Sequence, residues 1–308
     1  MKLYFAPLEG VTTYTFRNTH KEMFEGCDGY YSPFITPSDK ERIVLKNLRD
    51  ILPERNENIN LTVQVLTNRA DSFIKFADKV RGLGYNHINI NLGCPSGTVI
   101  KKGRGSGFLC DVEGIDNFLE EIFSKCDMKI SVKTRTGFYS HDEFDTLMEV
   151  YNKYPLELLI VHPRTRNELY NGMPNDDVFE KAYKTSKNKL CYNGNIFTLG
   201  RYNEITARFP KLDSVMLGRG ALMNPALFRE IKGGKPVNIS EIIDFSKTLA
   251  EKYLVVLDSD RYTLNRLKEL WFYVMWNYPD EKKIIKGIKK SEKLCDILNV
   301  IDTMKGIE

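Results

Sequence analysis

The segment LTVQVLTNRADSFIKFADKVRGLGYNHININ, residues 61–91, contains the repeating unit from which the fold is predicted. Two short runs rich in apolar and β-branched residues, Leu61–Leu66 and His87–Asn91, flank a stretch with apolar residues at helical spacing, Ala70–Leu83. A strand, a helix and a second strand in this order are typical of a parallel β-sheet, because parallel neighbours need a crossover connection.

The same unit recurs along most of the chain, with a second clear helical pattern at Gly114–Ser124. The predicted strands are Leu3–Ala6, Gly29–Phe34, Leu61–Leu66, His87–Asn91, Lys129–Thr134, Leu156–Val161, Lys189–Tyr192 and Ser214–Leu217. Eight is the number of parallel strands that closes into a barrel, so we favour an α/β fold with a (β/α)8 TIM barrel over an open doubly wound sheet.

The barrel pattern ends near Ile231, and a Lys-Gly-Gly-Lys-Pro linker follows at Lys232–Pro236. The segment Ile239–Asp302 has helical spacing and contains no convincing strand. We therefore predict two domains, a TIM barrel over residues 1–235 and a small C-terminal helical domain over residues 236–308.

The composition excludes several classes of protein. The net charge of +4 comes from 45 basic and 41 acidic residues, an excess too small to indicate nucleic acid by itself. The six cysteines include no C-x-x-C pair, which argues against a zinc site or a disulfide framework. No apolar run is long enough to cross a membrane, and no signal peptide is recognisable. We expect a cytoplasmic protein without metal or membrane contact, and a monomer because no exposed apolar stripe is evident.

Polar residues follow seven of the eight predicted strands. Because the active site of a TIM barrel lies at the carboxyl ends of its strands, we expect these side chains to meet at one mouth. They are Glu9 after the first strand, Gln64 on the third, Asn91 and Cys94 on or after the fourth, Lys133 and Arg135 on the fifth, His162 and Arg164 on the sixth, Asn193 and Asn195 on the seventh, and Arg219 on the eighth.

The loops Asn193–Asn195 and Gly218–Gly220 indicate a phosphorylated cofactor. They contain glycine and precede helices, so their backbone N–H groups can bind a phosphate, to which Arg219 could add a bidentate contact. A glycine turn with a solvated arginine is the alternative for Gly218–Gly220. Lys133 either stabilises negative charge on an electron-accepting ring or extends into solvent from its strand end. His162 is either structural or part of the site.

Cys94 is a candidate reactive thiol. An isolated cysteine is usually a small buried apolar residue, but Lys101, Lys102 and Arg104 lie in the same loop. Nearby cations favour a reactive thiol, so the position of Cys94 after a strand end favours a function.

Taken in order, these motifs resemble those of the tRNA-dihydrouridine synthases, flavoenzymes that reduce particular uridines in transfer RNA. The most diagnostic is Asn91-Leu92-Gly93-Cys94-Pro95. The others are Ala6–Thr12 with Phe16-Arg17, Val63–Val65, Lys101-Lys102 leading to Gly105–Gly107, Val132–Gly137, Val161–Thr165, Asn193–Ile196, and Gly218–Leu222 with Asn224-Pro225. They keep their order across residues 3–231.

The resemblance implies an FMN-dependent oxidoreductase in which NADPH reduces FMN and the reduced flavin passes hydride to C6 of a uracil ring. Cys94 would then donate the proton to C5, since a thiol with an ordinary pKa of about 8.5 is mainly protonated at neutral pH. The lysines of its loop would face RNA phosphate. The implied FMN-binding residues are Pro7, Leu8, Glu9, Gln64, Lys133, His162, Asn193, Gly194, Asn195, Gly218 and Arg219.

Further residues are implied to contact the substrate, a uridine swung out of the RNA. Within the barrel these are Asn91, Arg135 and Arg164. This chain has Leu8 where the family more often has methionine, and Asn195 where it often has aspartate, which removes a charge near the cofactor.

The helical domain is implied to hold tRNA, with Arg266 and Lys268 as candidate RNA contacts. Trp271, Phe272 and Tyr273 are instead assigned to its core. In the predicted helix 281–293, four lysines share one face, and isoleucines form the buried face. The lysines are Lys283, Lys286, Lys290 and Lys293, and the isoleucines are Ile284, Ile285 and Ile288. The lysine face either contacts RNA or is simply solvated.

Two other functions compete with this interpretation. The first is an FMN barrel acting on a free pyrimidine, like a dihydroorotate dehydrogenase, but such an enzyme lacks the added helical domain. The second is an RNA-binding protein whose barrel has lost catalysis, which the presence of Cys94, Lys133 and His162 disfavours.

Overall fold

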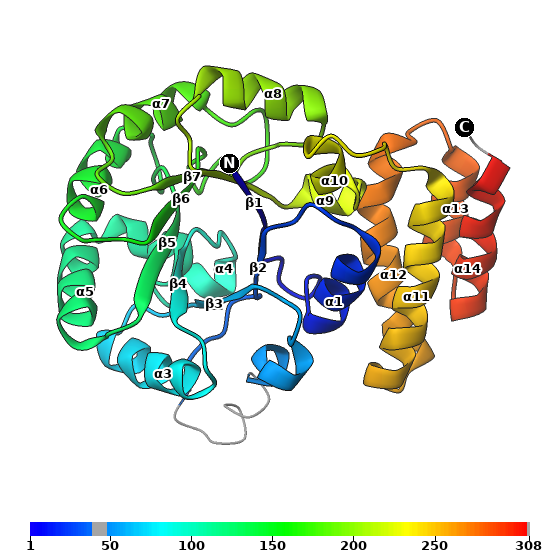
Figure 1. Cartoon of the computed structure of the whole chain (residues 1–308), viewed down its shortest axis with the longest axis horizontal. Coiled ribbons are helices and arrows are strands. Elements are labelled where there is room, and N and C mark those ends of the chain that lie inside the picture. Colours follow the sequence, from blue (N-terminus) through cyan, green and yellow to red (C-terminus); the bar gives the residue numbers. More distant parts are fainter. Residues whose placement is uncertain (39–47, 307–308) are drawn as a thin grey trace.

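The eight predicted strands form a closed parallel barrel in the computed structural model, which describes residues 1–38 and 48–306 (Figure 1). They are β1 (Lys2–Phe5), β2 (Gly29–Tyr31), β3 (Leu61–Val65), β4 (His87–Leu92), β5 (Lys129–Arg135), β6 (Leu158–His162), β7 (Leu190–Tyr192) and β8 (Ser214–Leu217). Each strand pairs with the next, and β8 pairs with β1. The predicted TIM barrel is confirmed.

Helices surround the barrel (Figure 1). They are α1 (Tyr14–Met23), α3 (Ala70–Gly82), α4 (Gly97–Ile100), α5 (Val112–Lys125), α6 (Glu143–Tyr151), α7 (Asp176–Thr185), α8 (Leu199–Arg208), α9 (Arg219–Met223) and α10 (Leu227–Ile231). Helix α5 illustrates the pattern, because its apolar residues Ile115, Phe118, Leu119 and Ile122 are all buried. Its first turn is capped by Asp111, whose carboxylate accepts the N–H of Gly114 at 2.9 Å.

The interior of the barrel has an apolar and a polar side. Side chains alternate along a strand, so every second residue faces the barrel axis. An apolar cluster fills one side and consists of Ala6, Tyr31, Leu158, Ile160, Cys191 and Met216. On the other side, β3, β4 and β5 present amides and hydroxyls that bond to one another, including Gln64, Asn89 and Ser131. Ala6 and Met216 of the apolar cluster reach the cleft at the mouth of the barrel.

The chain after the linker is helical, as predicted, and stands beside the barrel against α1 (Figure 1). It contains α11 (Ile239–Leu257), α12 (Asp260–Val274), the 3-10 turn η4 (Met275–Asn277), α13 (Lys282–Lys290), α14 (Leu294–Asp302) and the turn η5 (Thr303–Gly306). Phe245 of α11 contacts Phe16 and Phe24 of the barrel edge, with ring centroids 5.6 and 5.3 Å apart. Apolar packing therefore joins the two parts.

Two expectations for the helical part are wrong. Helix α13 ends at Lys290 with Ser291 as its C-cap, and Lys293 is the N-cap of α14, so Lys293 does not share a helix with the other lysines. Trp271 is fully buried and donates its indole N–H to Ser246 Oγ at 3.0 Å, but Phe272 is 57% exposed. The core assignment therefore fails for Phe272, whose position on α12 faces solvent rather than α11.

Within residues 1–38 and 48–306, no helix is long and apolar enough to cross a membrane. The same residues contain no group of three or more histidine, cysteine, aspartate or glutamate side chains that could hold a metal ion.

Candidate active site at the mouth of the barrel

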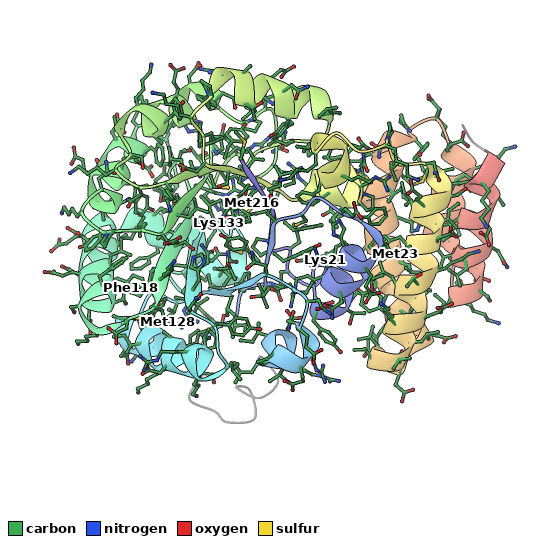
Figure 2. All side chains as sticks on the ribbon, in the orientation of Figure 1. Lys21, Met23, Phe118, Met128, Lys133 and Met216 are labelled. Atoms are coloured by element: carbon green, nitrogen blue, oxygen red, sulfur yellow. The ribbon has the colours of Figure 1, made fainter. Side chains whose placement is uncertain are left out.

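A cleft with about 500 Å³ of open space lies at the carboxyl ends of the strands. Most of the residues predicted to bind a cofactor line it: Pro7, Leu8, Lys133, His162, Asn193, Gly194, Asn195, Gly218 and Arg219. Figure 2 labels Lys133 and Met216, both of which line the cleft, inside the ring of strands. Glu9 and Gln64 do not line it: Glu9 is exposed in the loop after β1, and Gln64 is fully buried.

Four cations meet around this cleft: Lys133, Arg135, Arg164 and Arg219. None of them forms an ion pair with a carboxylate in the described part of the chain. Burial, reinforced by the charge of Arg135, lowers the pKa of Lys133 to about 8. Lys133 and Arg219 line the cleft itself, and a cation without a carboxylate partner is costly to bury, so their position indicates a site for an anionic or electron-rich ligand.

His162 is neutral at this mouth and has a defined tautomer. Burial, with the charges of Arg135, Lys133 and other nearby cations, holds its pKa well below the usual value. Arg164 Nη1 lies 3.0 Å from His162 Nε2. A guanidinium can only donate, so Nε2 accepts this bond and the proton of the ring lies on Nδ1. His162 can therefore offer one N–H donor to a ligand.

Asn195 ties two of the arginines together. Its side-chain oxygen accepts hydrogen bonds from Arg164 Nη1 at 3.2 Å and from Arg219 Nη2 at 2.6 Å. The backbone of Asn195 is left-handed, with φ of 36°, a conformation that asparagine adopts more readily than most residues. The amide thus orients both cations and leaves their charges intact. An aspartate at this position would neutralise part of that charge.

The two glycine-containing loops after β7 and β8 are packed too closely for side chains. A Cβ at Gly220 would lie 2.0 Å from the carbonyl oxygen of Ile196, and a Cβ at Gly194 would lie 2.9 Å from Pro174 Cγ. The backbone of each loop can therefore approach its neighbour and the cleft, which suits the binding of a phosphate by N–H groups.

Cys94 is half-buried beside this mouth, and its thiol is protonated at neutral pH. Burial raises its pKa, the Glu9 carboxylate raises it further, and Lys133 and Arg135 oppose the rise. The loop lysines Lys101 and Lys102 are exposed, and the cations that act on the thiol are Lys133 and Arg135 of β5.

The loop that carries Cys94 is held from two sides. The carbonyl oxygen of Cys94 accepts the backbone N–H of Ser106 at 3.1 Å and its hydroxyl at 2.8 Å. The side-chain oxygen of Asn91 accepts the N–H groups of Gly93 and Cys94 at 3.1 and 2.9 Å. Asn91, predicted to contact the substrate, thus positions the Cys94 loop and keeps its amide nitrogen for other bonds.

A chain of hydrogen bonds continues from Asn91 through the interior of the barrel. Asn91 Nδ2 donates to Gln64 Oε1, Gln64 Nε2 donates to Asn89 Oδ1, and Asn89 Nδ2 donates to Ser131 Oγ, each at 2.8 Å. Ser131 Oγ lies 2.8 Å from His87 Nε2. We call Asn91, Gln64, Asn89, Ser131 and His87 the amide chain. Both the oxygen and the nitrogen of the Gln64 side-chain amide form hydrogen bonds within the amide chain.

Replacing Ser131 with alanine should lower the free energy of unfolding by ~1–3 kcal/mol, because the side-chain N–H of the buried Asn89 and Nε2 of the half-buried His87 both lose this partner. Urea unfolding of the variant and the wild type measures the difference. Ser124→Ala is a matched control, since its exposed hydroxyl bonds only to the carbonyl of Glu121 on its own helix. Equal stability of the Ser131→Ala and Ser124→Ala proteins would show that the amide chain is not structurally important.

Tyr170 belongs to the site but was missed by the sequence analysis. It lies in the loop between β6 and α7, lines the cleft and is 49% exposed. Its ring centroid is 4.6 Å from Arg219 Cζ, 5.4 Å from Arg135 Cζ and 6.1 Å from the ring of His162. The available signal was an aromatic residue in the long loop that follows a functional strand end, since β6 ends at His162 and α7 begins only at Asp176.

The remaining predicted contacts have partners within the protein. Arg135 donates to the carbonyl oxygens of Gly93, Thr165 and Leu169 at 2.8–2.9 Å, and so connects the Cys94 loop to the Tyr170 loop. In the helical part, Arg266 donates to the carbonyl oxygen of Gly10, which attaches α12 to the loop after β1.

Lys268, the second candidate RNA contact on α12, also has a partner. It donates to the carbonyl oxygen of Lys289 at 3.1 Å, at the C-terminal end of α13. Arg266 therefore holds α12 to the barrel, and Lys268 holds α12 to α13.

Comparison with known proteins gives a consistent result. A family model described as "Dihydrouridine synthase (Dus)" matches residues 4–291. A "Probable tRNA-dihydrouridine synthase" from Staphylococcus epidermidis is 28% identical over 258 residues, which are 80% of this chain and 77% of that protein. "tRNA-dihydrouridine synthase B" from Pseudomonas syringae pv. tomato is 26% identical over 237 residues, 75% of this chain and 67% of that protein.

The fold is also similar to that of solved structures. Morphinone reductase has a TM-score of 0.54 at 11% identity and covers 77% of this chain and 87% of its own. The old yellow enzyme from Trypanosoma cruzi has a TM-score of 0.52 at 9% identity and covers 77% of this chain and 89% of its own. At these identities the likeness concerns the fold alone.

Proposed function

This chain belongs to the dihydrouridine synthase family, and from this membership we propose that it reduces uridines in transfer RNA to 5,6-dihydrouridine. The observation that carries the proposal is the match of that family's model through residue 291, which includes most of the helical part as well as the barrel. The alternative, a barrel enzyme acting on a free pyrimidine, is not favoured because it gives no role to these helices.

The mouth of the barrel suits FMN. The cleft combines the cations Lys133 and Arg219, which have no carboxylate partner among the described residues, the N–H donor of His162 and two closely packed glycine-containing loops. In this proposal the loops after β7 and β8 hold the phosphate together with Arg219. Lys133 and His162, which line the same cleft, would bind the flavin ring, and the lysine would stabilise negative charge that develops on it. When bound and reduced by NADPH, FMN supplies the hydride that C6 of the uracil ring receives.

Cys94 completes the reaction by donating its proton to C5 of the same ring. Two electrons and a proton arrive with the hydride and the second proton comes from the thiol, so uridine gains two hydrogens and NADPH becomes NADP⁺. The raised pKa keeps the proton on sulfur until it is needed. Because Cys94 is half-buried, solvent can restore its proton after each turnover.

We assign the substrate side of the site to Tyr170, Arg135 and Arg164. All three lie at the mouth, and Tyr170 is the exposed one. Its ring can contact an extruded base while Arg135, connected to the Cys94 loop, sets the position of the thiol relative to that base. The target uridine must leave the RNA stack to reach this depth.

In this proposal the two parts of the chain bind different parts of the substrate and cofactor. The barrel, residues 1–235, holds FMN and the target base, and the helices that follow residue 236 hold the rest of the tRNA. Contacts to the RNA backbone depend on cations, so the affinity for tRNA should fall as the salt concentration rises.

The affinity of the protein for FMN should fall as the pH rises through about 8, the pKa of Lys133. Below this pKa the lysine is charged and attracts the anionic cofactor, and above it the attraction is lost. Flavin fluorescence titrations of the FMN-free protein one pH unit below and above this value measure the effect. In Lys133→Arg the cation stays charged across this range, so its affinity should be insensitive to pH. A parallel loss in both proteins would exclude Lys133 as the cause.

The proposed reaction is tested by incubating the protein with FMN, NADPH and tRNA that lacks dihydrouridine, followed by mass spectrometry of the nucleosides. The expected result is a gain of two hydrogens on uridine at a defined position. Unchanged tRNA together with reduction of a free pyrimidine would replace the proposal with its alternative.

A further inference from the structure

The helical part has a groove of its own, separate from the mouth of the barrel. It has about 770 Å³ of open space and lies between α12 with η4 on one side and α13 on the other. Its lining is mainly apolar and consists of Lys268, Phe272, Met275, Trp276, Ile285, Ile288 and Lys289. We call it the aromatic groove.

Two large aromatic side chains are exposed in this groove. Phe272 is 57% and Trp276 is 43% exposed, whereas the neighbouring Trp271 is fully buried. The rings of Phe272 and Trp276 lie 5.9 Å apart at an angle of 69°, so they do not cover each other face to face. Exposed apolar groups gathered in one place indicate a binding surface, because the fold gains nothing from leaving them in water.

The surface around the aromatic groove is positively charged. Helix α13 carries five exposed lysines, Lys282, Lys283, Lys286, Lys289 and Lys290, and none of them pairs with a carboxylate within residues 48–306. Ile285 and Ile288 line the groove from the same helix as Lys289. Flat aromatic rings beside unpaired cations match the chemistry of single-stranded nucleic acid, whose bases stack and whose phosphates are anionic.

The aromatic groove adjoins the mouth of the barrel. The ring of Trp276 lies 6.3 Å from that of Phe197, which lines the cleft, and Arg219 Cζ lies 5.9 Å from the centre of the Trp276 ring. Trp276 therefore contacts a residue of the proposed cofactor site on one side and lines the groove on the other. A nucleic-acid strand whose target base enters the cleft passes next to this groove.

We propose that the aromatic groove binds a second, unstacked base of the tRNA, close in sequence to the uridine that enters the barrel. This inference rests on the proposed function. Extruding the target base removes the stacking partner of its neighbours, which costs a few kcal/mol. Stacking of a neighbouring base on Phe272 and Trp276 offsets that loss, and the lysines of α13 attract the adjoining phosphates.

The energetic test compares Phe272→Ala with Tyr262→Ala, which removes another exposed aromatic ring of the same helix that does not line the groove. Filter binding of tRNA lacking dihydrouridine gives the dissociation constant at several salt concentrations. Phe272→Ala should raise it by about 5- to 150-fold, the ratio expected for one stacked base. Its salt dependence should not change, because stacking releases no counterions. Tyr262→Ala should bind like the wild type.

A spectroscopic test observes the groove directly. The protein has only two tryptophans, and Trp276 is the exposed one, so quenching of its fluorescence reports on the groove. Adding tRNA lacking dihydrouridine to the FMN-loaded protein should quench this emission, and Trp276→Phe should abolish the change. Quenching by NADP⁺ but not by RNA would instead assign the groove to the dinucleotide.

The other outcomes separate this inference from the proposed function. Equal dissociation constants for Phe272→Ala and Tyr262→Ala, in a protein whose wild type forms dihydrouridine, would overturn the aromatic groove as a base site and leave the function intact. A wild type that forms no dihydrouridine would overturn the function first. Self-association that disappears in Phe272→Ala would identify the groove as a contact between two copies of this chain.

Discussion

Replacing Cys94 with alanine should lower the rate of uridine reduction by about 10²- to 10⁴-fold, the usual contribution of a general acid. The carbon C5 then has no positioned proton donor, and water must supply the proton. FMN binding and its reduction by NADPH should be retained, since the thiol does not line the cleft proposed to hold the cofactor. Anaerobic stopped-flow absorbance separates the two half-reactions, and mass spectrometry of the tRNA measures the product.

Cys110→Ala provides the matched control for this experiment. Cys110 is an exposed thiol at the end of the same connection between β4 and α5, and it lies outside the cleft. It should behave like the wild type. Cys94→Ser should be nearly as slow as Cys94→Ala, because a hydroxyl is a much weaker acid than a thiol. Wild-type rates in Cys94→Ala would remove the thiol from the mechanism, and loss of FMN reduction would indicate a structural role for its loop.

Replacing Lys133 with methionine should lower the rate of uridine reduction by about 10²- to 10³-fold, comparable to the loss of one preorganised electrostatic contact. Lys133 lies in the cleft without an ion-pair partner in the described residues, and its depressed pKa reflects the cost of burying that charge. In the proposed site the charge stabilises the electron-rich ring. Without it, the midpoint potential of bound FMN should become more negative and its reduction by NADPH slower.

Lys129→Met is the control, because Lys129 lies at the opposite end of the same strand and pairs with Glu157 at 3.7 Å. Its removal should affect neither the potential nor the rate. The FMN-free Lys133→Met protein should unfold at an equal or higher urea concentration than the wild type, since an uncompensated buried cation has been removed. A less stable variant with an unchanged flavin potential would mean that Lys133 supports the barrel rather than the chemistry.

The sequence predicts the barrel well because each strand is a short apolar run with a helix behind it. The start of β4 at His87 and both ends of β8 agree with the prediction, whereas β2 ends at Tyr31 instead of Phe34. Pro33 has no N–H to donate to a strand ladder, which favours the earlier end. The mouth residues follow from the same logic, since the end of a strand fixes where the next side chain lies.

The functional details were harder to predict because they depend on contacts distant in sequence. The amide chain could have been detected, because Gln64, Asn89 and Ser131 are polar residues that alternate with apolar ones along their strands. Its bonds depend on the register of β3, β4 and β5, which no local pattern reveals. Phe272 was assigned to the core because an aromatic residue beside a buried tryptophan on a helix usually is buried. Only the packing of α12 decides which of the two faces inward.

The division of the barrel interior has a consequence for engineering this enzyme. On the apolar side, Leu158 and Ile160 lie outside the cleft and have no side-chain polar groups, so each can be exchanged for a residue of similar volume at a packing cost alone. On the polar side, the members of the amide chain are hydrogen-bonded to one another. A single substitution there leaves the polar groups of its neighbours without a partner. Directed evolution of the barrel interior should therefore accept single changes at Leu158 and Ile160 of β6, whereas changes in the amide chain on β3, β4 and β5 should succeed only in compensating sets.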